Sequence, residues 1–195
     1  MPAVINKRDR AAREDVLRLM DVALNTGLRV SKILAIDEKD SVLLPDGWWL
    51  NLPEARSTTK DNPEMIPLNR QAAQALQCGV SSLKGTRVFG RWKDSNSFKQ
   101  LWIRILKQVG IQDLHFHDLR HTFATWLQDR GVPYEIRQIL LGHRLKGTTF
   151  EYSHGGKKYL REAVKTLDSV PLVAPLIDIL PQREWKKSLK SLVPR

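Results

Sequence analysis

Three side chains in one stretch of the chain could bind an anion together. His117, Arg120 and His121 lie three and four residues apart, so a helix would place them on one face. The guanidinium fork of an arginine matches the oxygens of a phosphate, and a neighbouring imidazole can donate a hydrogen bond to it. A purely structural interpretation, in which Arg120 pairs with Asp118 and the histidines cap or pack, stays open at this point.

The same two histidines have the spacing of a zinc-binding pair on a helix. Asp118 stands where the usual HExxH motif has its glutamate, and the charge of Arg120 would repel a cation. We therefore predict that the protein uses no metal and no other cofactor.

Three further side chains could take part in the same chemistry. Gly142 ends a predicted helix and would hold His143 at a rigid corner, and Tyr152 follows nine residues later. Arg29 comes after Gly27 at the end of another predicted helix. Taken singly, Tyr152 could be a half-buried surface aromatic and Arg29 an ordinary surface arginine.

Four motifs, taken in order, resemble those of the catalytic domain of the tyrosine recombinases, the phage integrase family. They are Thr26-Gly27-Leu28-Arg29, His117-Asp118-Leu119-Arg120-His121, Leu141-Gly142-His143 and Tyr152. The resemblance covers residues 14–167, and its specificity lies in the order and spacing of the four motifs. It implies a site-specific recombinase that cleaves and rejoins DNA through a 3′-phosphotyrosyl intermediate.

The resemblance also implies a role for each matching side chain. Arg29 and Arg120 would bracket the scissile phosphate, and His143 would donate a hydrogen bond to it. The nucleophile would be Tyr152, and Lys60 resembles the general acid that protonates the leaving 5′ oxygen. His117 would accept the proton of the tyrosine, completing the six-residue site.

Two positions depart from the family pattern. The residue three positions after the first arginine is usually acidic, but here it is Lys32. The seven residues from Lys60 to Pro67 are about one fewer than the pattern has, so the hairpin turn would differ.

These residues need a mostly α-helical fold with a small antiparallel β-sheet, an α+β domain. Two strands, at residues 48–52 and 65–68, would form a hairpin with Lys60 near its tip, and Thr148 or Thr149 would cap a short helix carrying Tyr152. Apolar periodicity and capping residues predict helices at 14–25, 31–36, 71–77, 97–109, 115–129, 133–141 and 157–167.

The chain divides into three parts on this interpretation. Residues 1–13 are expected to be a charged lead-in, residues 14–180 a single catalytic domain, and residues 181–195 a tail. The last four residues, Leu-Val-Pro-Arg, are similar to the remnant of a cleaved tag. The N-terminal core-binding domain that usually accompanies this catalytic domain is expected to be absent.

Composition and charge narrow the class of partner. The single cysteine, Cys78, excludes an internal disulfide framework, and no apolar run approaches the roughly 18 residues of a membrane span. The net charge of +11 lies entirely in residues 71–195, because residues 1–70 hold 11 basic and 11 acidic side chains. An uneven basic balance of this kind favours a nucleic acid as partner.

We therefore expect double-stranded DNA as the partner, no membrane, and a cytoplasmic, nucleoid-associated location. The full-length protein would act as a homotetramer on paired DNA sites, whereas this fragment could be a monomer. An integrase of a prophage or mobile element and a Xer-type recombinase fit equally well. The alternatives are a catalytically inactive DNA-binding remnant, a type IB topoisomerase-like enzyme and, more distantly, a zinc hydrolase based on His117 and His121.

Overall fold

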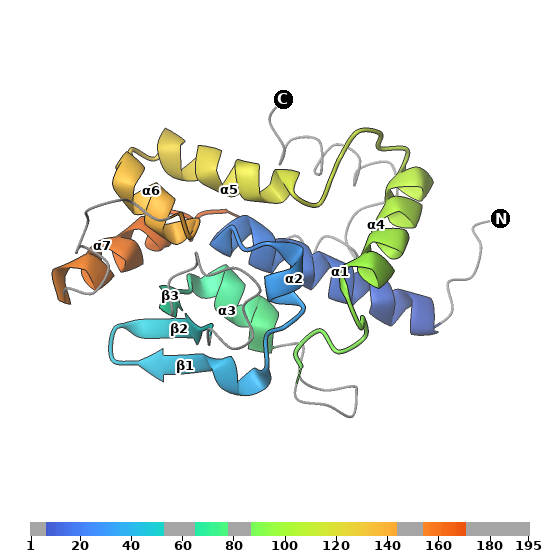
Figure 1. The fold of residues 1–195 in the computed structure, drawn as a ribbon, viewed down its shortest axis with the longest axis horizontal. Helices are drawn as coiled ribbons and strands as arrows, with labels where there is room; N and C mark the ends of the chain where they lie inside the picture. The colour runs from blue at the N-terminus through green and yellow to red at the C-terminus, as the bar shows by residue number, and fades with distance from the viewer. Residues whose placement is uncertain (1–6, 53–64, 78–86, 144–153, 171–195) are drawn as a thin grey trace.

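The computed structural model describes residues 7–52, 65–77, 87–143 and 154–170, which form helices and one small sheet (Figure 1). In chain order the elements are α1 (Lys7–Thr26), α2 (Val30–Ile33), the 3-10 helix η1 (Glu38–Asp40), β1 (Ser41–Leu44), β2 (Gly47–Asn51), β3 (Met65–Pro67), α3 (Arg70–Gln77), α4 (Ser95–Val109), α5 (Asp118–Asp129), α6 (Tyr134–Leu140) and α7 (His154–Lys165). This architecture confirms the predicted fold class.

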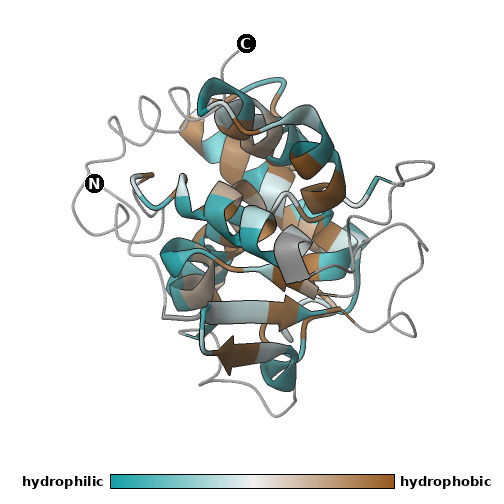
Figure 2. Cartoon of the chain, turned by 90° about the vertical axis from the view of Figure 1, so that its left-hand side faces the viewer, coloured by the Kyte–Doolittle hydropathy of each residue, from teal (hydrophilic) through white to brown (hydrophobic). Residues whose placement is uncertain are grey.

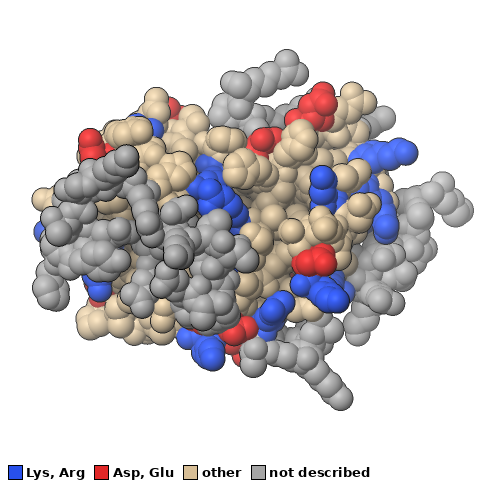
Figure 3. Space-filling view, in the orientation of Figure 1, with Lys and Arg blue, Asp and Glu red and all other residues tan. Residues whose placement is uncertain are grey.

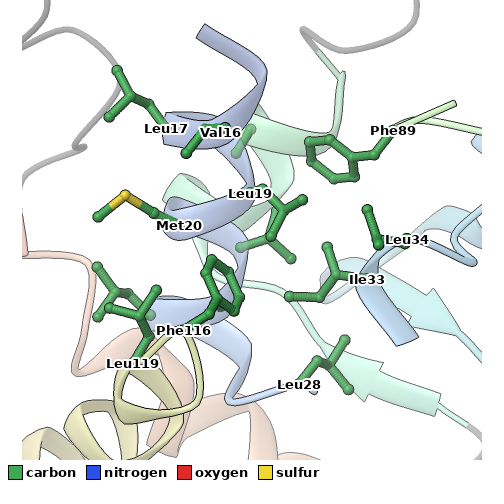
Figure 4. Close-up of a cluster of buried hydrophobic side chains, with 14 of the residues drawn as sticks. Val16, Leu17, Leu19, Met20, Leu28, Ile33, Leu34, Phe89, Phe116 and Leu119 are labelled. Carbon is green, nitrogen blue, oxygen red and sulfur yellow. The ribbon is translucent and has the colours of Figure 1, made fainter. Parts of the chain in front are cut away.

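Helix α1 runs through the centre of the main core and contacts both α3 and α5. Its side chains Leu19 and Met20 are buried among residues from α2 and from the segments before α4 and α5, among them Phe89 and Phe116 (Figure 4). Apolar side chains on most sides of a helix are what a central position requires. The outer helices are instead amphipathic, with polar sides turned outward (Figure 2).

Helix α1 begins at Lys7, earlier than the start near residue 14 that periodicity predicted, so the second half of the expected lead-in is helical. The apolar stripe on which that prediction depended starts later than the helix. In the first turns, an exposed ion pair one turn apart supports the helix, with Arg10 Nε 3.1 Å from Glu14 Oε1.

The sheet has the strand order β1-β2-β3, and both pairs are antiparallel. Trp49 pairs with Val42 on one side and with Pro67 on the other. Strands β2 and β3 confirm the two predicted strands, whereas β1 was not predicted. It lacks the period-2 alternation of a half-buried strand, because Leu43 and Leu44 follow each other and are both exposed.

A second apolar cluster joins α5, α6 and α7. Phe123 and Leu127 of α5 meet Ile136 of α6 and Leu160 and Val164 of α7, all of them buried. The aromatic side chains of α4 and the loop before α5 belong to the main core, where the Phe98 and Phe116 rings meet edge to face at 5.0 Å. Helix α5 therefore contributes to both cores, and this gives its polar face a rigid support.

Three predicted features differ from the structure or lie outside the described residues. Helix α2 spans Val30–Ile33, not residues 31–36, and its N-cap is Arg29 rather than Ser31 because Arg29 is the last extended residue (φ −68°, ψ 146°). The hairpin tip at Lys60 and the short helix predicted around Tyr152 lie outside the described residues. In the described ranges, no helix is long and apolar enough to cross a membrane.

Candidate active site

Arg120 joins three of the four sequence motifs. Its side chain is buried, with 6% of its surface exposed. Nη1 donates to the carbonyl oxygen of Gly27 at 2.7 Å, and Nη2 donates to the carbonyl oxygen of Leu141. Nη2 also lies 3.3 Å from Nε2 of His143. One guanidinium thus fixes the turn after α1 and the corner after α6 relative to α5.

The N-terminal end of α5 holds Arg120 and the histidines in place. Asp118, the first residue of the helix, fixes the loop before it, since its Oδ2 accepts the backbone N–H of His115 at 2.7 Å. Leu119 and Phe123 bury the inner face of the helix, with exposed fractions of 1% and 0%. Arg120 lies beside that face and His117 at its edge, as the helical spacing predicted.

The turn after α1 requires a glycine. Gly27 has φ +65°, in the left-handed region that other residues rarely adopt. A Cβ at this position would lie 2.4 Å from Cδ1 of Phe123, so α5 approaches the turn too closely for any side chain. Because Arg29 follows this turn by two residues, the packing of Gly27 on Phe123 also sets the place of Arg29 next to α5.

Arg29 is half-buried and has an unused donor. In the described part of the chain, its Nη1 is buried and has no hydrogen-bond partner. Its charge acts on both Arg120 and His117, so these three side chains lie within electrostatic range of one another. A buried guanidinium nitrogen without an acceptor is costly, and a bound anion would satisfy it.

The electrostatics of the cluster favour an anion. Burial first, and then the charge of Arg29, lowers the pKa of Arg120 to about 10. The pKa of His117 is also below its usual value of 6.5, because desolvation and the charges of His121, Arg120 and Arg29 oppose protonation more than Asp118 favours it. His117 is therefore neutral at pH 7 and able to accept a proton.

His121 lies next to His117, with ring centroids 5.1 Å apart and planes at 83°. Both residues are exposed, and the contact between their rings shows that the two histidines share a face, whereas Arg120 is buried beside it. Among the described residues, no group of three His, Cys, Asp or Glu side chains could hold a metal ion.

Lys32 is buried, with 4% of its surface exposed, and it neighbours Arg29. Burial, and after it the charge of Arg29, lowers the pKa of its ammonium group. The charges that act on His117 are those of Arg29, Asp118, Arg120 and His121. At the position where the family usually has an acidic residue, the structure thus buries Lys32 on the Arg29 side.

The structure brings together four of the six predicted site residues: Arg29, His117, Arg120 and His143. Lys60 and Tyr152 lie outside the described residues, so their roles stay predictions. Their sequence neighbours are described, because α7 begins two residues after Tyr152 and β2 and β3 flank the segment that holds Lys60.

Sequence reasoning missed one side chain of the site, Gln138. Its Oε1 lies 2.5 Å from Nδ1 of His143. The only signal in the sequence is its position, five residues before His143 in the last turn of a predicted helix, and a glutamine there has no motif of its own.

Comparison with known proteins gives a consistent result. Residues 3–158 match the model of the Phage integrase family. The chain is 28% identical over 172 residues to the integrase of Salmonella phage P22, covering 81% of this chain and 44% of that protein. It is 31% identical over 151 residues to tyrosine recombinase XerA of Saccharolobus solfataricus, covering 77% and 48%.

The chain is also 27% identical over 156 residues to tyrosine recombinase XerC of Staphylococcus epidermidis, covering 74% of this chain and 50% of that protein. The chain thus spans about half the length of the curated relatives it matches. No solved structure matches it significantly.

Proposed function

The chain belongs to the phage integrase family, and from this premise we propose that it is the catalytic part of a site-specific DNA recombinase. It cleaves and rejoins double-stranded DNA through a covalent 3′-phosphotyrosyl intermediate. The observation that carries the proposal is the position of Arg120. Nη2 of its buried guanidinium lies 3.3 Å from Nε2 of His143. The charge of Arg29, whose Nη1 has no hydrogen-bond partner in the described part of the chain, acts on the same guanidinium.

The cationic cluster binds the scissile phosphate. Arg29 and Arg120 offer guanidinium donors to its non-bridging oxygens, and His143 places Nε2 beside Arg120, 3.3 Å from Nη2. Phosphoryl transfer depends mainly on positioning and on neutralising the charge that develops on these oxygens. Arginines and imidazoles supply that charge themselves, so the reaction we propose is metal-independent.

The covalent step exchanges one phosphoester for another. The phenol oxygen of Tyr152 attacks phosphorus, the bond to the 5′ oxygen breaks, and Lys60 gives that oxygen its proton. His117 accepts the proton of Tyr152, and its lowered pKa keeps it neutral and ready to do so. Rejoining runs the same steps in reverse with a 5′-hydroxyl of the exchanged strand. General acid–base help of this kind contributes about 10²–10⁴ in rate.

The proposal extends to assembly and location. Strand exchange joins two duplexes, so four catalytic sites on a homotetramer would serve paired DNA sites in the nucleoid. The element served would be a prophage or another mobile element, as for the phage relative, or a chromosome, as for a Xer-type enzyme.

A trapped adduct tests the proposal. A pool of nicked duplexes with a randomised recognition region loses the short 5′-hydroxyl strand after cleavage, so the protein stays attached to the DNA. We expect a denaturation-resistant adduct with the wild type and none with Tyr152→Phe. Tyr159→Phe on α7 is the matched control and should keep the adduct, because its side chain is exposed. An adduct that survives in Tyr152→Phe, or maps to Tyr134 or Tyr159, would overturn the assignment.

One observation favours the inactive DNA-binding remnant as a second candidate. The family's acidic position is occupied by Lys32, which is buried beside Arg29. A remnant would bind the same duplexes but form no adduct in the wild type, and the adduct assay separates the two.

A further inference from the structure

Gln138 holds His143 through its backbone. The carbonyl oxygen of Gln138 accepts the backbone N–H of His143 at 2.9 Å, and that of Ile139 accepts the N–H of Gly142 at 2.8 Å. Gly142 has φ +71°, so the pair forms the helix-ending arrangement in which a glycine reverses the chain after the last turn. The imidazole therefore leaves the end of α6 at a defined place.

The side chain of Gln138 makes a second contact with the same histidine, this time with its ring. Its Oε1 lies 2.5 Å from Nδ1 of the ring. On the other side of the ring, Nε2 lies 3.3 Å from Nη2 of Arg120. Both ring nitrogens of His143 thus have a named neighbour.

The chemistry of these neighbours determines which ring nitrogen carries the proton. A guanidinium has only donors, so Nε2 must turn its lone pair toward Arg120. A neutral imidazole has one N–H, which then lies on Nδ1 and is donated to the amide oxygen of Gln138. Both contacts favour the same tautomer, with the proton on Nδ1 and the lone pair on Nε2.

We infer that Gln138 is a positioning residue that holds neutral His143 in the Nδ1–H tautomer, with Nε2 aimed at Arg120 and the phosphate site. This inference rests on the proposed function for its role in the reaction, whereas the tautomer belongs to the free protein. Without an acceptor at Nδ1, a histidine ring in water prefers the other tautomer, which would turn an N–H against the Arg120 donors.

The arrangement also explains how His143 can donate to a phosphate oxygen. Nε2 must first take up one proton from solvent, and the resulting imidazolium has an N–H on each nitrogen. Gln138 accepts from Nδ1–H before and after that step, so its amide oxygen suits both states. Nη2 of Arg120 keeps the carbonyl oxygen of Leu141 as acceptor.

Ring-nitrogen NMR of the free chain tests the tautomer directly. Long-range proton–nitrogen correlations should give the Nδ1–H pattern for His143 in the wild type. Gln138→Leu should lose that pattern, whereas Gln138→Glu, which keeps an acceptor oxygen, should retain it. The matched control is Gln128→Leu, which breaks a similar glutamine contact, from Nη1 of Arg137 to Oε1 at 2.8 Å, and should leave His143 unchanged.

Cleavage of the nicked substrate tests the role in catalysis. Gln138→Leu should slow adduct formation by up to about 10²-fold, the cost of a misplaced group, and Gln138→Glu should recover most of the rate. In a His143→Gln background, Gln138→Leu should have little further effect, because its target is gone.

The inference fails if Gln138→Leu keeps the Nδ1–H tautomer. It also fails if Gln138→Leu slows the His143→Gln protein as much as the wild type, because a merely structural glutamine would act equally in both. A wild type with the Nδ1–H tautomer but no adduct would count against the proposed function alone.

Discussion

At the residue scale, the site is a cluster of cations whose charge and donors suit an anion. The pKa of Arg120 is about 10 because burial and the charge of Arg29 oppose its own charge. The N–H groups of Arg120 that reach Gly27 and Leu141 position it, while the unsatisfied Nη1 of Arg29 is a donor that a phosphate oxygen would satisfy. The free protein therefore carries an electrostatic cost that a bound phosphate would relieve.

His117 makes stability depend on pH in a defined direction. Its folded pKa lies below the unfolded value near 6.5, so the unfolded chain takes up the proton first as pH falls. The stability that neutral His117 contributes is fully present above pH 6.5 and is lost progressively below it. Urea midpoints of wild type and His117→Gln between pH 5 and 8 measure this. We expect a shallower acid loss in His117→Gln, and parallel curves would contradict the assignment.

Lys32 adds a further positive charge beside Arg29. Lys32→Glu would place a carboxylate beside Arg29, so the free protein should gain more than about 0.5 kcal/mol, beyond the usual range of surface changes. Sulfate should stabilise the wild type by mass action, and it should stabilise Lys32→Glu less. Thermal melts with and without sulfate measure both effects.

Ser31→Glu provides the control for Lys32→Glu. Residue 31 is the exposed sequence neighbour of Lys32, so it receives the same charge without the burial. Its sulfate shift should stay close to that of the wild type. Equal sulfate shifts in wild type and Lys32→Glu would show that Lys32 plays no part in anion binding.

At the element scale, Arg161 ties α7 to the sheet. The side chain is 5% exposed, and it donates from Nη1 to Leu68 at 2.8 Å and from Nη2 to Trp48 at 2.7 Å, in both cases to a carbonyl oxygen. Its guanidinium lies 4.7 Å from the ring centroid of Trp49, and a Cβ at Gly47 would lie 3.2 Å from Nη1. The glycine therefore permits the close approach that joins the second core to the first.

Removing this tie should destabilise the whole fold. Arg161→Met leaves the Leu68 carbonyl without its guanidinium donor and removes the cation from Trp49, so we expect a loss of about 2–4 kcal/mol in urea unfolding. Arg130→Met is the control, because Arg130 also donates to two carbonyl oxygens, those of Trp126 and Thr166, but is exposed. Arg130→Met should cost less than about 1 kcal/mol of unfolding free energy. Equal losses in the two variants would show that the Arg161 contacts do not hold α7 on the sheet.

At the scale of the whole molecule, charge is divided between two halves of the chain. All of the net +11 comes from residues 71–195, although the described surface mixes basic and acidic groups (Figure 3). Residues 157 and 158, both lysines at the exposed start of α7, follow closely after Tyr152 in sequence. This region is the natural place for contacts with the phosphate backbone.

DNA binding by this chain should therefore depend strongly on salt. A log–log plot of affinity against salt should be linear with a slope of about −0.9 per phosphate that the protein neutralises. Replacing Lys157 and Lys158 by glutamine should make the slope shallower by about 0.9 for each phosphate that is no longer neutralised, whereas Lys39→Gln on η1 should leave it unchanged. Fluorescence anisotropy with a labelled duplex measures the slope, and a salt-independent affinity would exclude this mode of binding.

The sequence by itself determined the fold class, most of the helices and the identity of the site motifs. Apolar periodicity located α4 within two residues, because Phe98 and Trp102 repeat at the spacing of a helix whatever surrounds them. Gly142 marked the end of α6 and Gly27 the end of α1 for an equally local reason, since each needs positive φ. Local signals of this kind can be recognised in the sequence without knowledge of the tertiary structure.

Only the tertiary structure decided how those motifs meet. Arg120 reaches Gly27, 93 positions away in the chain, and His143, 23 positions away, through contacts that no local pattern encodes. The burial of Lys32 and the second contact of Gln138 with His143 likewise depend on which elements pack together. Side-chain periodicity reports the face that a helix buries, whereas the partner of each polar atom follows from packing between distant segments. That difference is why candidate site residues could be proposed from the sequence, whereas their hydrogen bonds and electrostatic neighbours could not.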